Sequence, residues 1–132
     1  MPWKIRLIDR PPAVHVTVSG NLRLPLIKRL ASEALAEAAR RAVRRFLMDE
    51  REMVPDLSTL EIHQLPDILA RLGLAKSDPV AIVYSETAPR AADFRFFENT
   101  ALNRGFRLRL FTRIDDALEW LGRVSREAPQ PA

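Results

Sequence analysis

Strand patterns and helix patterns alternate along the chain, and this alternation limits the folds that it can adopt. Residues 3–8 and 13–19 carry an apolar side chain at every second position, which is typical of a strand with one buried face. Residues 79–84 are apolar on both faces, as in a central strand of a parallel sheet. Short strands are also predicted at residues 45–49 and 106–111, which makes five predicted strands. Residues 50–57 are predicted to form a loop.

Apolar residues at helical spacing follow four of these strands. This spacing predicts helices over residues 24–42, 58–72 and 91–104, and a final helix that Thr112 caps. Pro66 lies inside the second of these helices, where its missing N–H predicts a kink or two abutting turns.

The order of the predicted elements indicates an α/β fold. Two prolines after Asp9 predict an antiparallel hairpin with a longer loop between the first two strands. The later strands are joined by helices, which is typical of right-handed parallel crossovers. We therefore expect a single mostly parallel five-stranded sheet with an antiparallel N-terminal strand and helices mainly on one face. The domain is predicted to span residues 1–124, followed by a disordered tail at 125–132.

The residue types that most catalytic and cofactor sites need are scarce. The 132 residues include no cysteine, which excludes disulfides, thiolate zinc sites and thiol nucleophiles. The four glycines each end a predicted element, so none of them belongs to a phosphate-binding loop. His15 and His63 lie in different elements, without the spacing of a metal site. We expect a protein that is not an enzyme and that holds no cofactor or metal.

Charge and hydropathy narrow the range of partners. The chain has 21 Lys and Arg residues against 17 Asp and Glu residues, spread over helix surfaces, one sheet face and strand-end loops. An open sheet face is expected to be lined by the basic residues Lys4, Arg6, Arg107 and Arg109. Stacking of bases needs aromatic rings, and Phe111 is the one ring on this face. Nucleic acid is therefore not expected as a partner.

No apolar run approaches the roughly 20 residues of a membrane helix, and the N-terminus has no signal-peptide core. A cytoplasmic location is therefore expected.

Polar side chains gather where the predicted strands end. Ligands and partners of parallel α/β sheets meet the carboxyl ends of the strands. Ser58 and Glu61 have the spacing of a capping box, and Ser58 and Thr59 lie at a helix N-terminus, which favours a negative group. Two interpretations are open. Ser58 and Thr59 form a phosphorylation or anion site, or Ser58 is only the N-cap.

Phe94, Phe96 and Phe97 place aromatic rings around one predicted helix. Phe96 lies about 200° from Phe94, at about 100° per residue, so one ring is expected to point away from the core. An exposed ring marks a partner or lipid contact, and the alternative is that a neighbouring element covers Phe96. The candidate partner or ligand surface comprises Asp49, Arg51, Met53, Arg90, Phe94, Phe96 and Phe97.

Several segments carry a resemblance to a known family. They are Phe46–Asp49, Arg51, Asp56–Glu61, Val80–Tyr84, Phe96–Glu98, Asn103–Phe106 and Ala117–Leu121. Together they resemble the bacterial SpoIIAA-like family, a branch of the STAS domains (sulfate transporter and anti-sigma-factor antagonist). The similarity covers about residues 3–122.

This resemblance implies a STAS-type fold and a non-enzymatic module. In anti-sigma antagonists a serine at the start of the helix after the third strand is phosphorylated, and Ser58 lies at that location. The chain has Asp56-Leu57-Ser58-Thr59 where those antagonists have Asp-Ser-Ser-Gly. The resemblance thus implies a regulatory or protein-interaction module with an unknown protein partner.

A second function follows from relatives of the same family. Some STAS-like proteins resemble lipid-binding domains of the Sec14 type, which implies a carrier or sensor of a small apolar ligand or lipid as the alternative. An exposed Phe96 and an edge strand would also favour a homodimer.

Overall fold

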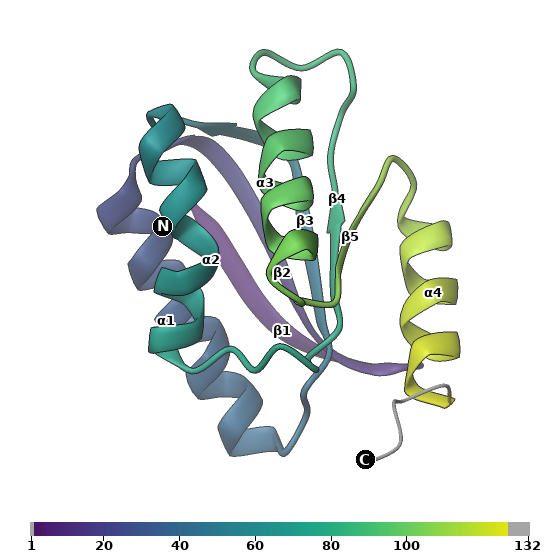
Figure 1. Cartoon of the computed structure of the whole chain (residues 1–132). Coiled ribbons are helices and arrows are strands. Elements are labelled where there is room, and N and C mark those ends of the chain that lie inside the picture. The colour runs from purple at the N-terminus through teal and green to yellow at the C-terminus, as the bar shows by residue number, and fades with distance from the viewer. Residues whose placement is uncertain (1, 127–132) are drawn as a thin grey trace.

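The computed structural model describes residues 2–126, which form one five-stranded sheet and four helices (Figure 1). The strands lie side by side in chain order: β1 (Trp3–Asp9), β2 (Pro12–Leu22), β3 (Phe46–Pro55), β4 (Val80–Val83) and β5 (Leu108–Phe111). The helices are α1 (Leu24–Arg41), α2 (Thr59–Leu72), α3 (Ala91–Asn103) and α4 (Ile114–Arg126). β1 pairs antiparallel with β2, and all other neighbours are parallel. The predicted α/β fold is confirmed. Residues 127–132 of the predicted tail lie outside the described residues.

The positions of the helices follow from the order of the strands. From β2 to β5, each strand lies one place further along the sheet than the strand before it. Right-handed crossovers that all advance in one direction put their helices on the same face. Helices α1, α2 and α3 accordingly cover one face, whereas α4 follows the last strand and packs on the other (Figure 1). The prediction of helices mainly on one face is confirmed.

The alternation of side chains along the strands divides the buried residues into two cores. Val14, Val16 and Val18 of β2 belong to the main core beneath α1, α2 and α3. The smaller core lies under α4 and contains Ala13, Leu47, Ala81, Val83, Ala117 and Leu121. Near β1 this second face is polar, and Lys4 and Arg6 are exposed there.

The turn between β1 and β2 is shorter than predicted. β1 ends at Asp9 and β2 begins at Pro12, which pairs with it, so only Arg10 and Pro11 lie between the strands. The prediction of a longer loop was wrong because proline is tolerated at the first position of a strand, where its missing N–H costs little.

Helix α2 continues through its internal proline. It runs as one helix from Thr59 to Leu72, so the alternative of two abutting turns was wrong. Pro66 is fully buried, and burial of its ring compensates for the backbone hydrogen bond that its nitrogen cannot donate.

Strand β3 is much longer than its sequence pattern indicates. It continues to Pro55, through most of the segment from Glu50 to Leu57 for which a loop is predicted. Residues 52–55 pair with residues 19–22 of β2, beyond the point where β4 ends. The loop prediction was wrong because pairing with a distant strand, rather than a local pattern, makes this polar segment a strand.

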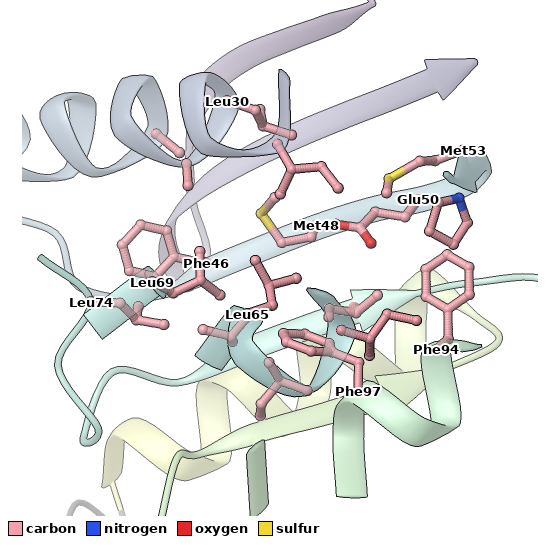
Figure 2. Close-up of a pocket in the computed structure, with 18 of the residues that line it drawn as sticks. Leu30, Phe46, Met48, Glu50, Met53, Leu65, Leu69, Leu74, Phe94 and Phe97 are labelled. Atoms are coloured by element: carbon pink, nitrogen blue, oxygen red, sulfur yellow. The ribbon is translucent and has the colours of Figure 1, made fainter. Parts of the chain in front are cut away.

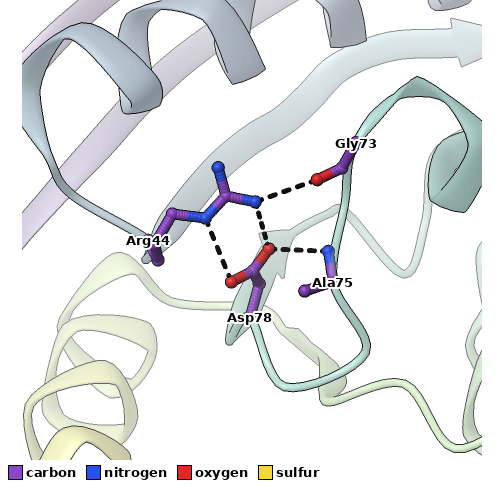
Figure 3. A network of polar contacts seen from close by, with 4 residues as sticks. All are labelled: Arg44, Gly73, Ala75 and Asp78. Carbon is purple, nitrogen blue, oxygen red and sulfur yellow. Dashed lines mark hydrogen bonds and ion pairs between the residues drawn. The ribbon is translucent and has the colours of Figure 1, made fainter.

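Arg44 and Asp78 join the connections that precede β3 and β4 (Figure 3). Arg44 donates from Nη2 to Oδ2 of Asp78 at 2.6 Å and from Nε to Oδ1 at 3.2 Å. It also donates to the carbonyl of Gly73 at 3.0 Å, and the N–H of Ala75 donates to Asp78 at 2.8 Å. Asp78 is buried, so these bonds satisfy a carboxylate that burial would otherwise penalise.

Candidate functional site

The start of α2 lies at the edge of the sheet where the parallel strands end. Ser58 is its exposed N-cap, and Oγ of Ser58 accepts a hydrogen bond from the N–H of Glu61 at 3.1 Å. The Glu61 carboxylate accepts one from the N–H of Ser58 at 2.9 Å, which confirms the predicted capping box. Thr59 is the first helical residue and is also exposed. The positive end of the helix dipole therefore faces solvent beside two hydroxyl groups.

Arg90 places a guanidinium beside this helix start. Its Nη2 donates to the carbonyl of Leu57 at 2.5 Å, its Nε donates to Asp93 at 2.7 Å, and it forms an ion pair with Asp56 at 3.8 Å. Arg90 has a φ of 64°, in the left-handed region that costs a residue with a Cβ about 1–2 kcal/mol. The contacts to the loop before α2 and to Asp93 of α3 stabilise this conformation.

Asp49 and Arg51 lie on the opposite face of the sheet, the face of the smaller core. The carboxylate of Asp49 accepts hydrogen bonds from Nε and Nη2 of Arg51 at 2.9 and 2.8 Å. These bonds hold the pKa of Asp49 below its usual value. Burial lowers the pKa of the nearby His15 imidazole, and the charge of Arg6 lowers it further. Arg51 is thus engaged on the face away from α2.

A β-bulge interrupts β3 next to Glu50. Thr17 of β2 pairs with Asp49, whereas Ser19 pairs with Glu52, so β3 has one extra residue between these two pairs. Such an extra residue shifts the alternation of side chains along the bulged strand. Glu50 continues the alternation of Phe46 and Met48 and lies on the face of the main core, and after the bulge Met53 returns to that face.

A cavity of about 120 Å³ lies between the sheet and helices α1, α2 and α3 (Figure 2). All three helices and β3, β4 and β5 contribute side chains to its wall. The wall is apolar over most of its area and includes Leu30, Phe46, Met48, Leu65, Leu69 and Phe97. Within residues 2–126, the charged side chains that line it are Glu50 and Asp93. The cavity suits an apolar group that carries one polar end.

Glu50 is a carboxyl group in surroundings that do not favour its charge. Figure 2 shows its side chain extending from β3 into the group of lining side chains. No hydrogen bond or ion pair joins its partly buried carboxyl group to the described part of the chain. Burial, together with the smaller effect of the Asp49 charge, raises the pKa of Glu50 to about 8. The carboxyl group is therefore mainly protonated at neutral pH.

The residues of the predicted surface divide among three places. Met53, Phe94 and Phe97 line the cavity. Asp49 and Arg51 lie on the opposite face of the sheet, and Arg90 lies with Ser58 and Thr59 at the start of α2. Phe96 is partly buried and packs against the main core. The structure thus separates an apolar cavity from a polar edge.

Sequence reasoning missed Glu50. A loop is predicted for the segment around it, so no face was assigned to its side chain. The alternation of Phe46, Met48 and Glu50 was the available signal, because every second residue of a strand lies on one face. A carboxyl group in that series indicates a polar group within an apolar wall.

The described residues provide neither a metal site nor a membrane-spanning helix. Residues 2–126 contain no cluster of three or more His, Asp or Glu side chains arranged to hold a metal ion. No helix in the same range is long and apolar enough to cross a membrane.

Comparisons with known proteins bear on the fold. No family model matches the chain, and no curated protein sequence matches it. Solved structures do match. An anti-sigma factor antagonist from Mycobacterium paratuberculosis superposes with a TM-score of 0.56 at 21% identity, over 90% of this chain and 93% of that chain. An uncharacterized protein of the DUF3478 family from Shewanella loihica, which has a SpoIIAA-like fold, gives 0.53 at 19% identity, over 90% and 91%.

A third solved structure matches over a similar share of both chains. The phosphorylated form of the Bacillus cell fate determinant SpoIIAA superposes with a TM-score of 0.56 at 12% identity, over 89% of this chain and 97% of that chain. All three likenesses cover nearly the whole length of both chains. The chain therefore has a SpoIIAA-like fold of the STAS type.

Proposed function

We propose that the protein is a non-enzymatic regulatory module that binds a protein partner at the start of α2. The exposed residues of this region form one surface, which we call the α2 edge. It comprises Asp56, Ser58, Thr59, Leu60 and Arg90. The fold supports this proposal, because it is shared with an anti-sigma factor antagonist and with the phosphorylated form of SpoIIAA.

The observation that carries the proposal is the position of Ser58. Its hydroxyl group is exposed at the positive end of a helix, and Arg90 contacts the carbonyl of the preceding residue. A phosphate group on Ser58 would add about −1.5 to −2 charges, which the helix dipole and the Arg90 guanidinium would stabilise. The same phosphate would compete with Asp56 for Arg90 and so change the charge pattern of the α2 edge.

Leu60 supplies an apolar contact within this polar surface. Its side chain is 62% exposed, next to Thr59 in the first turn of α2. Burial of this leucine in a complex would be favourable, because its apolar surface would leave water. A partner that covers Leu60 would also contact Ser58 and sense its phosphorylation.

Affinity capture with surface variants tests the proposed partner surface. Leu60→Asp is the variant, and Leu102→Asp is the matched control because Leu102 is also exposed, on α3. We expect the wild type and Leu102→Asp to capture proteins that Leu60→Asp does not capture. Equal capture by all three forms would contradict binding at the α2 edge.

The cavity supports a second candidate function, the binding of a small apolar ligand. Its volume of about 120 Å³ is close to the roughly 150 Å³ of an apolar cavity that binds benzene, and below the range of pockets for larger ligands. A ring or short chain fits it, whereas a long acyl chain does not fit without movement of the helices. Titration of the protein with toluene, followed by NMR shifts of the lining residues, tests this function. Unchanged spectra at saturating toluene would contradict it.

Self-association stays a prediction. The outer edges of β1 and β5 are the two edges of the sheet, where a second copy would pair. Light scattering at high protein concentration distinguishes a dimer from a monomer.

A further inference from the structure

We propose that the cavity binds a small primary amine with an apolar body, whose ammonium group pairs with the carboxylate of Glu50. This inference rests on the second candidate function, the binding of a small ligand in the cavity. It adds the chemical class of that ligand and the residue that recognises its polar group.

The wall of the cavity determines the size and kind of apolar group that a ligand can carry. The side chains that α1 and α2 contribute are aliphatic, including Leu30 and Leu65, and α3 adds the rings of Phe94 and Phe97 (Figure 2). β4 and β5 contribute only apolar side chains. A single ring or a short aliphatic chain fills the volume of about 120 Å³ and buries its surface against this wall.

The charged side chains of the wall determine which charge the polar group of a ligand should carry. Within the described residues they are Glu50 and Asp93, both acidic. An anionic ligand would bring a negative charge beside Asp93 and would oppose the ionisation of Glu50, which Coulomb repulsion disfavours. A cationic group meets complementary charge there.

Glu50 is the carboxyl group that remains without a partner. Asp93 already accepts a hydrogen bond from Arg90 at 2.7 Å. No described residue donates a hydrogen bond to the carboxyl group of Glu50, although the side chain lies in the wall of the cavity together with Phe46 and Met48. An ammonium group offers three donors and a positive charge, which is the complement that a buried carboxylate lacks.

Benzylamine, toluene and benzoate are the ligands for the test, because they share a ring and differ in charge. Each is titrated into the full chain at pH 7 and followed by NMR shifts of the lining residues. The variants are Glu50→Gln, which keeps the shape of the side chain, and Glu52→Gln, a control at an exposed carboxyl group of the same strand. We expect benzylamine to bind most tightly, and at least tenfold less tightly to Glu50→Gln, with no change for Glu52→Gln. Toluene should bind both variants as it binds the wild type.

The pH dependence of binding gives a readout that needs no variant. Glu50 is protonated below its pKa, which burial raises to about 8, so pairing with an ammonium group releases one proton. The affinity for benzylamine should rise with pH between 6 and 8, by up to about tenfold per unit, whereas that for toluene should not rise. The other nearby titratable groups are not placed to cause this pH dependence. Asp93 of α3 is paired with Arg90, and Asp49 faces the other side of β3. Helices α1 and α2 and strands β4 and β5 bring no titratable group into the cavity.

The outcomes separate this inference from the function on which it rests. If toluene binds but Glu50→Gln leaves benzylamine binding unchanged, or weakens both ligands equally, the amine proposal is wrong and the small-ligand function stands. If neither toluene nor benzylamine binds, both are wrong. Tighter binding of benzoate than of benzylamine also overturns the assignment of Glu50.

Discussion

Arg90 donates a hydrogen bond from Nη2 to the carbonyl oxygen of Leu57 at 2.5 Å, across 33 residues of sequence. This bond joins the loop that follows β4 to the loop that follows β3 and places a guanidinium beside the N-cap of α2. Arg90 adopts a left-handed backbone conformation in making this contact. The edge at which we propose that a partner binds is therefore held together by a residue in an unfavourable conformation.

Two substitutions of Arg90 separate its contacts from its backbone conformation. Arg90→Gly and Arg90→Ala both remove the guanidinium, but alanine keeps a Cβ at a positive φ. We expect the free energy of unfolding in urea to be about 0.5–1 kcal/mol greater for Arg90→Gly than for Arg90→Ala. Equal stability of the two variants would contradict the left-handed conformation.

Asp78→Asn tests the contact between the connections that precede β3 and β4. The substituted side chain would keep one acceptor oxygen but would lose the charge that pairs with Arg44 (Figure 3). We expect the free energy of unfolding to fall by about 1–3 kcal/mol, because the carboxylate is buried and its bonds are charge-assisted. Asp67→Asn, at an exposed carboxylate paired with Arg104, is the control and should change stability by less than about 0.5 kcal/mol. A loss as large in the control would show that general charge effects dominate.

Glu50 should make the stability of the protein depend on pH in the neutral range. Its pKa is about 8 in the folded protein and near 4.5 in the unfolded chain, so the folded state binds the proton more tightly. The contribution of Glu50 to the free energy of unfolding is complete below pH 4.5. It is lost as the pH rises toward and through 8. Between pH 5 and pH 8 this loss amounts to about 3 kcal/mol, since one pKa unit corresponds to about 1.4 kcal/mol.

Comparison with Glu50→Gln isolates this contribution. Burial lowers the pKa of His15, which adds a trend of opposite sign, and this trend cancels in the difference between the wild type and the variant. We expect urea unfolding curves from pH 5 to pH 8 to show the loss in the wild type and in Glu52→Gln, but not in Glu50→Gln. Parallel pH profiles for all three proteins would contradict the burial of an ionisable Glu50.

Ala34→Leu tests whether the cavity is the binding site. Ala34 of α1 lines the cavity, and a leucine at this position would occupy much of its volume. We expect the affinity for toluene to fall at least tenfold while the protein stays folded, because the added side chain fills space that is already empty. Ala36→Leu, on the exposed side of the same helix, is the control and should bind toluene as the wild type does. Unchanged binding to Ala34→Leu would place the ligand elsewhere.

The sequence predicts those parts of the fold whose patterns are local. The alternation along β2 and the apolar run of β4 identify two strands, and the capping box at Ser58 identifies the start of α2. Each of these signals lies within a few residues, so the chain needs no distant partner to express it. The α/β class follows from the order of these elements.

The candidate cavity depends on pairing that the local pattern does not contain. β3 extends beyond Asp49 because β2 continues alongside it, and the bulge between Asp49 and Glu52 exists only in that pair of strands. The direction of Glu50 follows from the extension of β3, and the return of Met53 to the same face follows from the bulge. The left-handed conformation of Arg90 likewise depends on Leu57, which is distant in sequence. Such relationships become visible only when the paired strands and loops are seen together.

The effect of Ser58 phosphorylation on partner affinity tests the account most directly. Mass spectrometry of the protein isolated from its own cells establishes whether Ser58 carries phosphate. The affinity of the partner captured through Leu60 is then measured for Ser58→Glu, for Ser58→Ala and for Ser32→Glu, a control at an exposed serine in the middle of α1. Ser58→Ala removes the cap at a cost of about 1 kcal/mol and should leave the protein folded.

We expect phosphate on Ser58 and a change in partner affinity of at least tenfold for Ser58→Glu, with Ser32→Glu binding as the wild type does. An unmodified Ser58, together with equal affinities for Ser58→Glu, Ser32→Glu and the wild type, would contradict a regulatory role for the start of α2.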